Sequence, residues 1–310
     1  MRSRGIDVFR GFSIALMIFF SVIARLSGAL PDILDHNVSG SMHIGDFVLT
    51  LFIFASGMSL VFFERKKRSG SGYLLDVLER TGKLLMVWLF ISPFSSGRFL
   101  GMDELALIAV LALPTLLLLR FSDRVIAFAA IAPVFLYIIL VMTAPISFSS
   151  GYLGGFIAVP FYLPVMLCGA LVGRKLMEGA DALSAAMPVL TGASLTALIL
   201  LAFIPPYKMD ASPTFMGASI VVSGWLFIFV SGFGEPHMER MGRDPMRYWV
   251  LMFILFLIPL AFYGFGYAGG LPLGLGWVEA TLISLLCIPI VYLISDGVDK
   301  AVLIARDVRR

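Results

Sequence analysis

The sequence is poor in charged residues, cysteine, histidine and side-chain amides. Only 14% of its 310 residues are charged, whereas soluble domains carry about 25%, and 59% are hydrophobic. This composition excludes a soluble enzyme, because a water-soluble fold could not bury so much apolar surface. It also excludes an intrinsically disordered chain, whose segments are polar and rich in charge.

Cysteine and histidine are too scarce for a disulfide framework or a common metal cluster. Cys168 and Cys287 both lie in apolar runs, where free cysteine behaves as a small packing residue. The three histidines are His36, His43 and His237, and no C-x-x-C or H-E-x-x-H motif is present. No metal site is therefore expected. Asparagine occurs once and glutamine is absent, a depletion that is typical of heat-adapted proteins.

Long apolar runs are what the sequence has in abundance. A membrane-spanning helix needs roughly 20 apolar residues, and the runs are too continuous for the alternating strands of a β-barrel. We therefore expect an all-α, polytopic integral membrane helix bundle of about ten transmembrane helices, with residues 1–310 forming a single domain. The predicted segments are 8–29, 46–63, 80–95, 105–119, 125–142, 156–173, 185–204, 214–233, 247–265 and 274–295.

The distribution of Lys and Arg predicts the orientation of these segments. With a cytoplasmic N-terminus, 20 of the 23 basic residues fall inside, and only Arg25, Arg98 and Lys208 fall outside. Such an excess on one side marks the cytoplasmic face. Both termini are therefore predicted to be cytoplasmic, in a multi-pass protein of the cell (plasma) membrane.

Placing an ionisable side chain at the centre of a membrane-spanning helix costs about 2.5–3.5 kcal/mol, so each such residue needs a structural or functional explanation. Asp7 and Arg10 are spaced i, i+3 and can pair on one helix face. Arg10 is either an arginine that snorkels to the interface beside its counter-ion or a fixed cation at the inner mouth of a cavity.

A second group meets the opposite face of the membrane. His36 and Asp46 are ten residues apart, and His43 lies between them. Asp46 directly precedes an apolar run and could cap the helix. Alternatively, it could accept a hydrogen bond from an imidazole and make that imidazole a general base. The residues alone leave open whether His36 or His43 is the partner.

Two further sets are ambiguous in the same way. Glu279 lies about one turn into the last segment, after Trp277. It is either a carboxylate at the membrane interface or a functional residue. The basic residues on the inner side either enforce topology or bind the phosphates of a nucleotide-type cofactor. Those with candidate phosphate contacts are Arg80, Lys83, Arg174 and Arg243.

Five short motifs follow one another along the chain. They are D-x-F-R-G at 7–11; His36, Gly40 and Asp46 followed by small residues at 56–59; P-x-x-x-x-G-x-x-x-G-R at 164–174; Lys208 with Ser-Pro-Thr-Phe at 212–215; and G-R-D-P at 242–245. This series resembles the heparan-α-glucosaminide N-acetyltransferase family and its prokaryotic relatives, which are multi-span transmembrane acyltransferases. The chain departs from the family pattern at Ser21 and Asp244, where the family has Asn, and at Thr50, where it has Pro.

The resemblance implies acetyl-CoA, or another acyl-CoA, as a cytosolic donor and an acceptor across the membrane. It makes His36 the catalytic residue, with Asp46 orienting it, and places Arg10 beside a donor tunnel. Together with the charge pattern, the resemblance predicts two sets of binding residues. The donor is expected to contact Asp7, Arg10, Ser21, Arg80, Lys83, Arg174 and Arg243. The acceptor is expected to contact Lys208 and Glu279.

The implied acceptor is an amine or hydroxyl of an extracytoplasmic glycan or glycolipid. Acyl-CoA, this acceptor and the lipid bilayer are the expected partners; a homodimer is left open, and no nucleic acid is expected. The alternative is a transporter of a small or lipid-linked solute that uses Asp7, Arg10, Asp46 and Glu279 as intramembrane binding charges. A structural or regulatory subunit would leave the outer histidine unexplained.

Overall fold

The computed structural model describes residues 3–34, 42–67, 73–95, 100–143, 155–208, 210–262 and 273–307. These ranges contain no β-strand, only an isolated bridge between Ser27 and Leu275. The all-α prediction is therefore confirmed. The elements are α1 (Arg4–Leu26), η1 (Asp32–Leu34), α2 (Ile44–Lys67), α3 (Tyr73–Ser95), α4 (Glu104–Leu118), α5 (Asp123–Thr143), α6 (Gly155–Met177), α7 (Ala182–Leu201), α8 (Pro213–Ser231), α9 (Pro236–Arg243), α10 (Pro245–Met252), η2 (Phe253–Leu257), α11 (Ile258–Phe262) and α12 (Trp277–Asp307).

Among the described residues, 8 helical segments are long and apolar enough to cross a membrane. They are α1, α2, α5, α6, α7, α8, the continuous stretch from α10 to α11, and α12. With 15 residues, α4 is shorter, and α3 carries charged residues in its first turns. The chain is thus a multi-pass membrane protein, while the expected total of about ten crossings stays a prediction.

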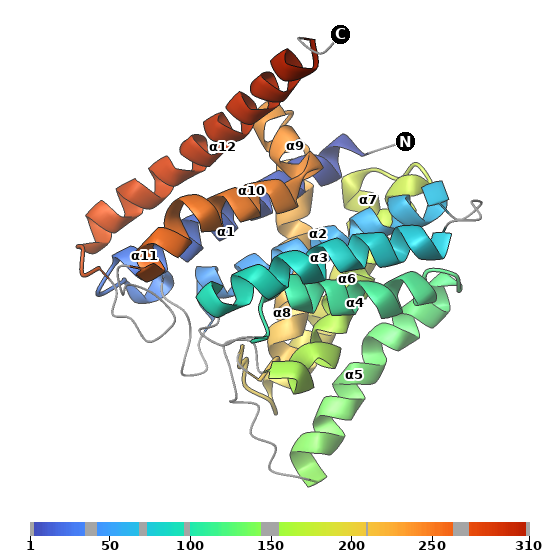
Figure 1. The fold of residues 1–310 in the computed structure, drawn as a ribbon. Helices are drawn as coiled ribbons and strands as arrows, with labels where there is room; N and C mark the ends of the chain where they lie inside the picture. Colours follow the sequence, from blue (N-terminus) through green and yellow to red (C-terminus); the bar gives the residue numbers. More distant parts are fainter. Residues whose placement is uncertain are drawn as a thin grey trace.

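Helices α1 and α2 lie at the centre of the bundle, and α5 and α7 lie at its edge. In their most apolar windows, 72% of α1 and 78% of α2 are buried inside the protein, but only 22% of α5 and 17% of α7. The central helix α2 packs against α6, while α5 packs on α6 and α7 on α8. In Figure 1, α5 and α12 lie at opposite edges of the molecule. The outer helices therefore present their apolar side chains to lipid.

Glycines make the crossing of α2 and α6 close. A Cβ atom added at Gly169 would lie 2.1 Å from the carbonyl oxygen of Phe54, and one at Gly57 would lie 2.0 Å from that of Met166. Without these Cβ atoms the two backbones can touch, as small residues allow in membrane helices. The contact fixes α2, and with it Asp46, against α6.

A second glycine contact joins the first motif of the chain to the last. A Cβ at Gly11 would lie 1.8 Å from the carbonyl oxygen of Met238, and one at Gly242 would lie 1.7 Å from that of Asp7. Helix α9 therefore crosses α1 in direct backbone contact. The D-x-F-R-G and G-R-D-P motifs, more than 200 residues apart in the sequence, form one structural unit.

Helix α9 also reaches the last turns of α12. Arg240 on α9 pairs with Asp296 and with Asp299, the latter at 3.0 Å, while Arg4 at the start of α1 pairs with Glu239 at 2.9 Å. The start of α1 and the end of α12 thus lie on the same side of the bundle, which we call the basic end. That this side faces the cytoplasm stays a prediction.

Candidate functional site

Asp46 uses its two carboxylate oxygens for different partners. One oxygen accepts a hydrogen bond from the backbone N–H of His43 at 3.0 Å, as the third residue of a helix does in a capping box. The other lies 3.1 Å from the Nζ atom of Lys208. Both side chains are buried, with relative exposures of 1% for Asp46 and 4% for Lys208. Asp46 therefore caps the start of α2 and also belongs to a buried charged site.

The turn between α7 and α8 positions Lys208. The Ser212 hydroxyl accepts hydrogen bonds from the backbone N–H groups of Tyr207 at 3.0 Å and Phe215 at 3.3 Å, and it donates to the carbonyl of Pro205 at 3.0 Å. Pro213 follows at the first position of α8, where its lack of an N–H costs nothing. The Ser-Pro-Thr-Phe motif thus builds a rigid turn that holds Lys208 against α2.

Three more side chains complete what we call the Asp46 cluster, which consists of Asp46, Lys208, Glu104, Arg25 and Tyr162. The Glu104 carboxyl, in the first turn of α4, interacts electrostatically with Arg25 and Lys208. Arg25 is buried near the end of α1 and donates to the carbonyl of Ser21 at 2.7 Å. Three helices and one turn therefore bring two cations and two carboxylates together, and α6 adds Tyr162.

Tyr162 is the remaining member of the cluster. Its side chain is 1% exposed, and it interacts electrostatically with Asp46 and Glu104. In the described part of the chain its hydroxyl has no hydrogen-bond partner, although a buried hydroxyl normally has one. The cluster thus holds a hydroxyl group that is available to a ligand atom.

The charges in the cluster balance one another. Burial lowers the pKa of Lys208, and the neighbouring carboxylates of Asp46 and Glu104 oppose this shift. A buried charge without a partner would be strongly destabilising, so each carboxylate favours the protonated lysine.

A second polar site lies at the basic end. Arg10 and Asp7 form an ion pair at 3.7 Å, and their side chains are 13% and 4% exposed. The carbonyl of Asp7 abuts Gly242 of α9, and the next residue, Arg243, pairs with Glu239. The expected pairing of Asp7 with Arg10 is present, and the structure brings Arg243 near it.

Several predicted donor contacts have protein partners in the structure. Lys83 pairs with Glu79 at 2.5 Å, and Arg80 lies over the ring of Phe63 at 5.2 Å. Arg174 donates to Asp123 at 2.7 Å, to the carbonyl of Phe121 at 2.8 Å and to that of Leu119. This arginine therefore ties the end of α6 to the turn between α4 and α5, and its binding of acyl-CoA stays a prediction.

The remaining predicted residues lie elsewhere. Ser21 is one turn before Arg25 on α1, at the Asp46 end of the molecule rather than the basic end. Glu279 is exposed in the first turn of α12. His36 lies outside the described residues, so its role also stays a prediction. No group of three His, Cys, Asp or Glu side chains that could hold a metal ion occurs among the residues described.

Glu104, Arg25 and Tyr162 were not predicted as members of the site. A carboxylate at the start of an apolar helix has the pattern of a helix cap, and Asp103 does cap α4 by accepting from the backbone N–H groups of Leu105 and Ala106. A tyrosine in an apolar run looks like a packing residue. The only available signal was the position of Arg25, one of three basic residues on the sparsely charged side.

Comparison with known proteins identifies one family. The family model described as heparan-alpha-glucosaminide N-acetyltransferase, catalytic, matches residues 2–199, which is more than half of the 310 residues. No curated protein matches the chain. The matched range contains the Asp7–Arg10 pair, His36 and Asp46, and it ends before Lys208.

Proposed function

The chain belongs to the heparan-alpha-glucosaminide N-acetyltransferase family, and on that premise we propose that it transfers an acetyl or other acyl group across the membrane. The donor is cytosolic acyl-CoA, and the acceptor is an amine or hydroxyl of an extracytoplasmic glycan or glycolipid. The observation that carries the proposal is the family match, because residues 2–199 include both the Asp7–Arg10 pair and the segment from His36 to Asp46.

The length of α1 supports different roles for its two ends, with the donor phosphates bound at one end and the reacting groups at the other. Arg10 and Arg25 are 15 residues apart on this one helix, or about 22 Å at 1.5 Å per residue. Cations at the basic end suit the phosphates of CoA, and the Asp46 cluster at the other end suits the reacting groups. A thin pantetheine arm would bridge the distance, so that CoA itself need not cross.

In the proposed reaction His36 acts as the general base. It removes a proton from the acceptor as the acceptor nitrogen or oxygen forms a bond to the acyl carbon; the thioester C–S bond breaks, and a proton ends on the CoA thiol. In a two-step variant, the imidazole itself is acylated first and then passes the group on. Both schemes need a neutral imidazole, so activity should fall when acidification protonates it.

The Asp46 cluster would orient His36 and raise the basicity of its imidazole. A carboxylate that accepts a hydrogen bond from an imidazole fixes its tautomer and raises its basicity. Lys208 would hold the orientation of the Asp46 carboxylate through the 3.1 Å ion pair. The Tyr162 hydroxyl, buried beside Asp46 and Glu104, would donate a hydrogen bond to oxygen as negative charge develops on the thioester carbonyl.

The test compares histidine and aspartate variants of the purified protein in detergent, supplied with labelled acetyl-CoA and a simple α-glucosaminide or an envelope lipid extract. His36→Ala should lower transfer by about 10²–10⁴-fold, the usual contribution of a general base, and Asp46→Asn should also lower it. His237→Ala is the matched control, because His237 lies on α9 and its ring packs on Tyr292. Undiminished transfer by His36→Ala would reject the assignment.

A further inference from the structure

One face of α12 carries polar side chains where this helix passes α9 and α10 (Figure 1). The residues on this face are spaced by three or four positions and are buried or half-buried: Tyr292, Ser295, Asp296 and Asp299. Residues at such spacing share one side of a helix. The opposite side, with Val298 at 46% exposure, faces outward. The polar face of α12 is therefore turned toward the protein at the basic end.

Two arginines from α9 and α10 bind this face. Arg240 on α9 pairs with Asp296 and, at 3.0 Å, with Asp299. Arg247 on α10 also pairs with Asp299, and it donates to the carbonyl of Ser295 at 2.6 Å. Asp299 is thus shared by both arginines. Ion pairs joined into a network stabilise a structure more than isolated surface pairs do.

Tyr292 adds ring contacts to this network. The guanidinium carbon of Arg240 lies 5.6 Å from the centre of the Tyr292 ring, within the range of a cation–π interaction. The ring of Tyr248 on α10 stacks on Tyr292 with 6.3 Å between the ring centres. Both α9 and α10 are therefore attached to the same face of α12.

Helix α9 in turn supports the donor end of α1. With 8 residues, it is too short to be stable without tertiary contacts. It crosses α1 where Gly242 abuts the carbonyl of Asp7, and Asp7 pairs with Arg10 at 3.7 Å. The residue after Gly242 is Arg243. Arg10 and Arg243, both expected at the CoA phosphates, therefore come from different helices, and their relative position depends on the placement of α9.

From this series of contacts we propose that Asp299 is a positioning residue for the donor. Through Arg240 and Arg247 it holds α9 in place on α1, and α9 holds Arg243 beside Arg10 at the site of the CoA phosphates. The inference rests on the proposed function. It makes Arg240 and Arg247 partners of α12 rather than phosphate ligands, and it gives the last helix, which lies outside the matched residues 2–199, a role in donor binding.

Asp299 can be changed with little risk to folding, because its side chain is 44% exposed. Asp299→Asn removes the charge that Arg240 and Arg247 share, and Asp299→Glu keeps a carboxylate and should rescue the function.

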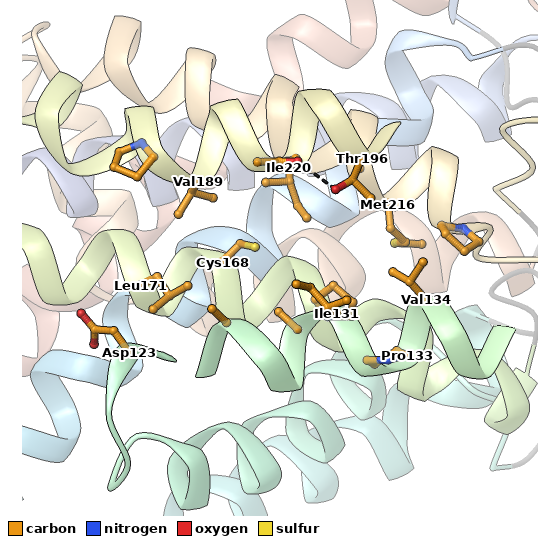
Figure 2. A pocket seen from close by; sticks show the side chains of 18 of the residues that line it. Asp123, Ile131, Pro133, Val134, Cys168, Leu171, Val189, Thr196, Met216 and Ile220 are labelled. Carbon is orange, nitrogen blue, oxygen red and sulfur yellow. Dashed lines mark hydrogen bonds between the residues drawn. The ribbon is translucent and has the colours of Figure 1, made fainter. Parts of the chain in front are cut away.

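Asp181→Ala is the control for a general loss of stability. Asp181 caps α7 by accepting from the backbone N–H of Ser184 at 3.0 Å, and loss of a cap destabilises a helix. Helix α7 borders the apolar groove of Figure 2, whose lining comes from α5 to α8 and the turn before α8. The control therefore perturbs a different part of the protein.

The experiment compares two donors, acetyl-CoA and S-acetylpantetheine, which lacks the nucleotide and its phosphates. Asp299→Asn should raise the Kd and the KM for acetyl-CoA about tenfold, as when one hydrogen bond to a charged group is lost, and leave kcat unchanged. Its Kd for adenosine 3′,5′-bisphosphate, the phosphate-bearing half of the donor, should rise by the same factor. Its KM for S-acetylpantetheine should equal that of the wild type.

Asp299→Glu should recover the affinity for acetyl-CoA, and Asp181→Ala should keep the wild-type affinity throughout. Wild-type affinity for acetyl-CoA and the bisphosphate in Asp299→Asn, or an equal loss with both donors, would overturn the positioning role and leave the transferase intact. A wild-type protein that neither binds acetyl-CoA nor transfers from it would overturn the proposed function and this inference together.

Discussion

At the scale of single residues, the ion pair of Asp46 and Lys208 is the interaction most sensitive to substitution. Lys208→Met would leave the Asp46 carboxylate buried without its cation, and loss of one partner of a buried pair costs about 3–5 kcal/mol. The double variant Asp46→Asn, Lys208→Met removes both charges and should recover much of that loss. Unfolding free energies in detergent measure this, and strictly additive losses would show that the two groups do not interact.

Glu239 should make the stability of the basic end depend on pH. A hydrogen bond from Arg243, reinforced by Arg4, holds the pKa of Glu239 below its ordinary value of 4.5. A carboxylate whose pKa is lower in the folded state stabilises the fold above its unfolded pKa, and this contribution is lost as pH falls through the folded value. Glu239→Gln should therefore lower the thermal midpoint at neutral pH.

The difference between Glu239→Gln and the wild type should vanish in acid, well below pH 4.5. Glu178→Gln is a suitable control for a surface carboxylate, because the partner of Glu178 among the described residues is its neighbour Lys175, at 2.8 Å. A Glu239 effect that is the same at both pH values would mean that its charge does not stabilise the contact between α1 and α9.

At the scale of helices, the close approach of α2 and α6 should tolerate no added carbon. Gly169→Ala would place a methyl group 2.1 Å from the carbonyl oxygen of Phe54, and overpacking of this kind costs about 1–3 kcal/mol. Gly82→Ala on α3 meets nothing within 4 Å and should stabilise by up to about 1 kcal/mol through helix propensity alone. Equal effects of the two substitutions on the unfolding free energy would contradict the crossing.

Most helices could be predicted from the sequence, because a long apolar run in lipid must be helical to satisfy its backbone. The π-helical turn in the α10–α11 stretch could not be predicted in this way. Pro259 lacks an N–H and crowds the preceding turn, and the chain accommodates it with the wider π-helical turn of η2. Hydropathy also carries no information on which helices touch, so the α1–α9 contact was not predicted.

At the scale of the whole molecule, the order of the motifs pointed to residues that the fold brings together, whereas the charges also pointed to a residue that lies apart from them. The family spacing pointed to Asp46 and Lys208 separately, and the structure pairs them at 3.1 Å. Charges alone also pointed to Glu279, which lies exposed on α12. A charge in an apolar run has the same pattern whether it faces a cavity, an ion partner or the interface, and only the packing of the helices distinguishes these cases.

The most direct test of the account separates donor and acceptor by a membrane. Sealed proteoliposomes are loaded with an α-glucosaminide and an envelope lipid extract, and labelled acetyl-CoA is added only outside. The account predicts labelled acceptor inside while CoA stays outside, and no labelled acceptor with His36→Ala. Product that forms only when donor and acceptor share one compartment, or equal labelling with His36→Ala, would contradict it.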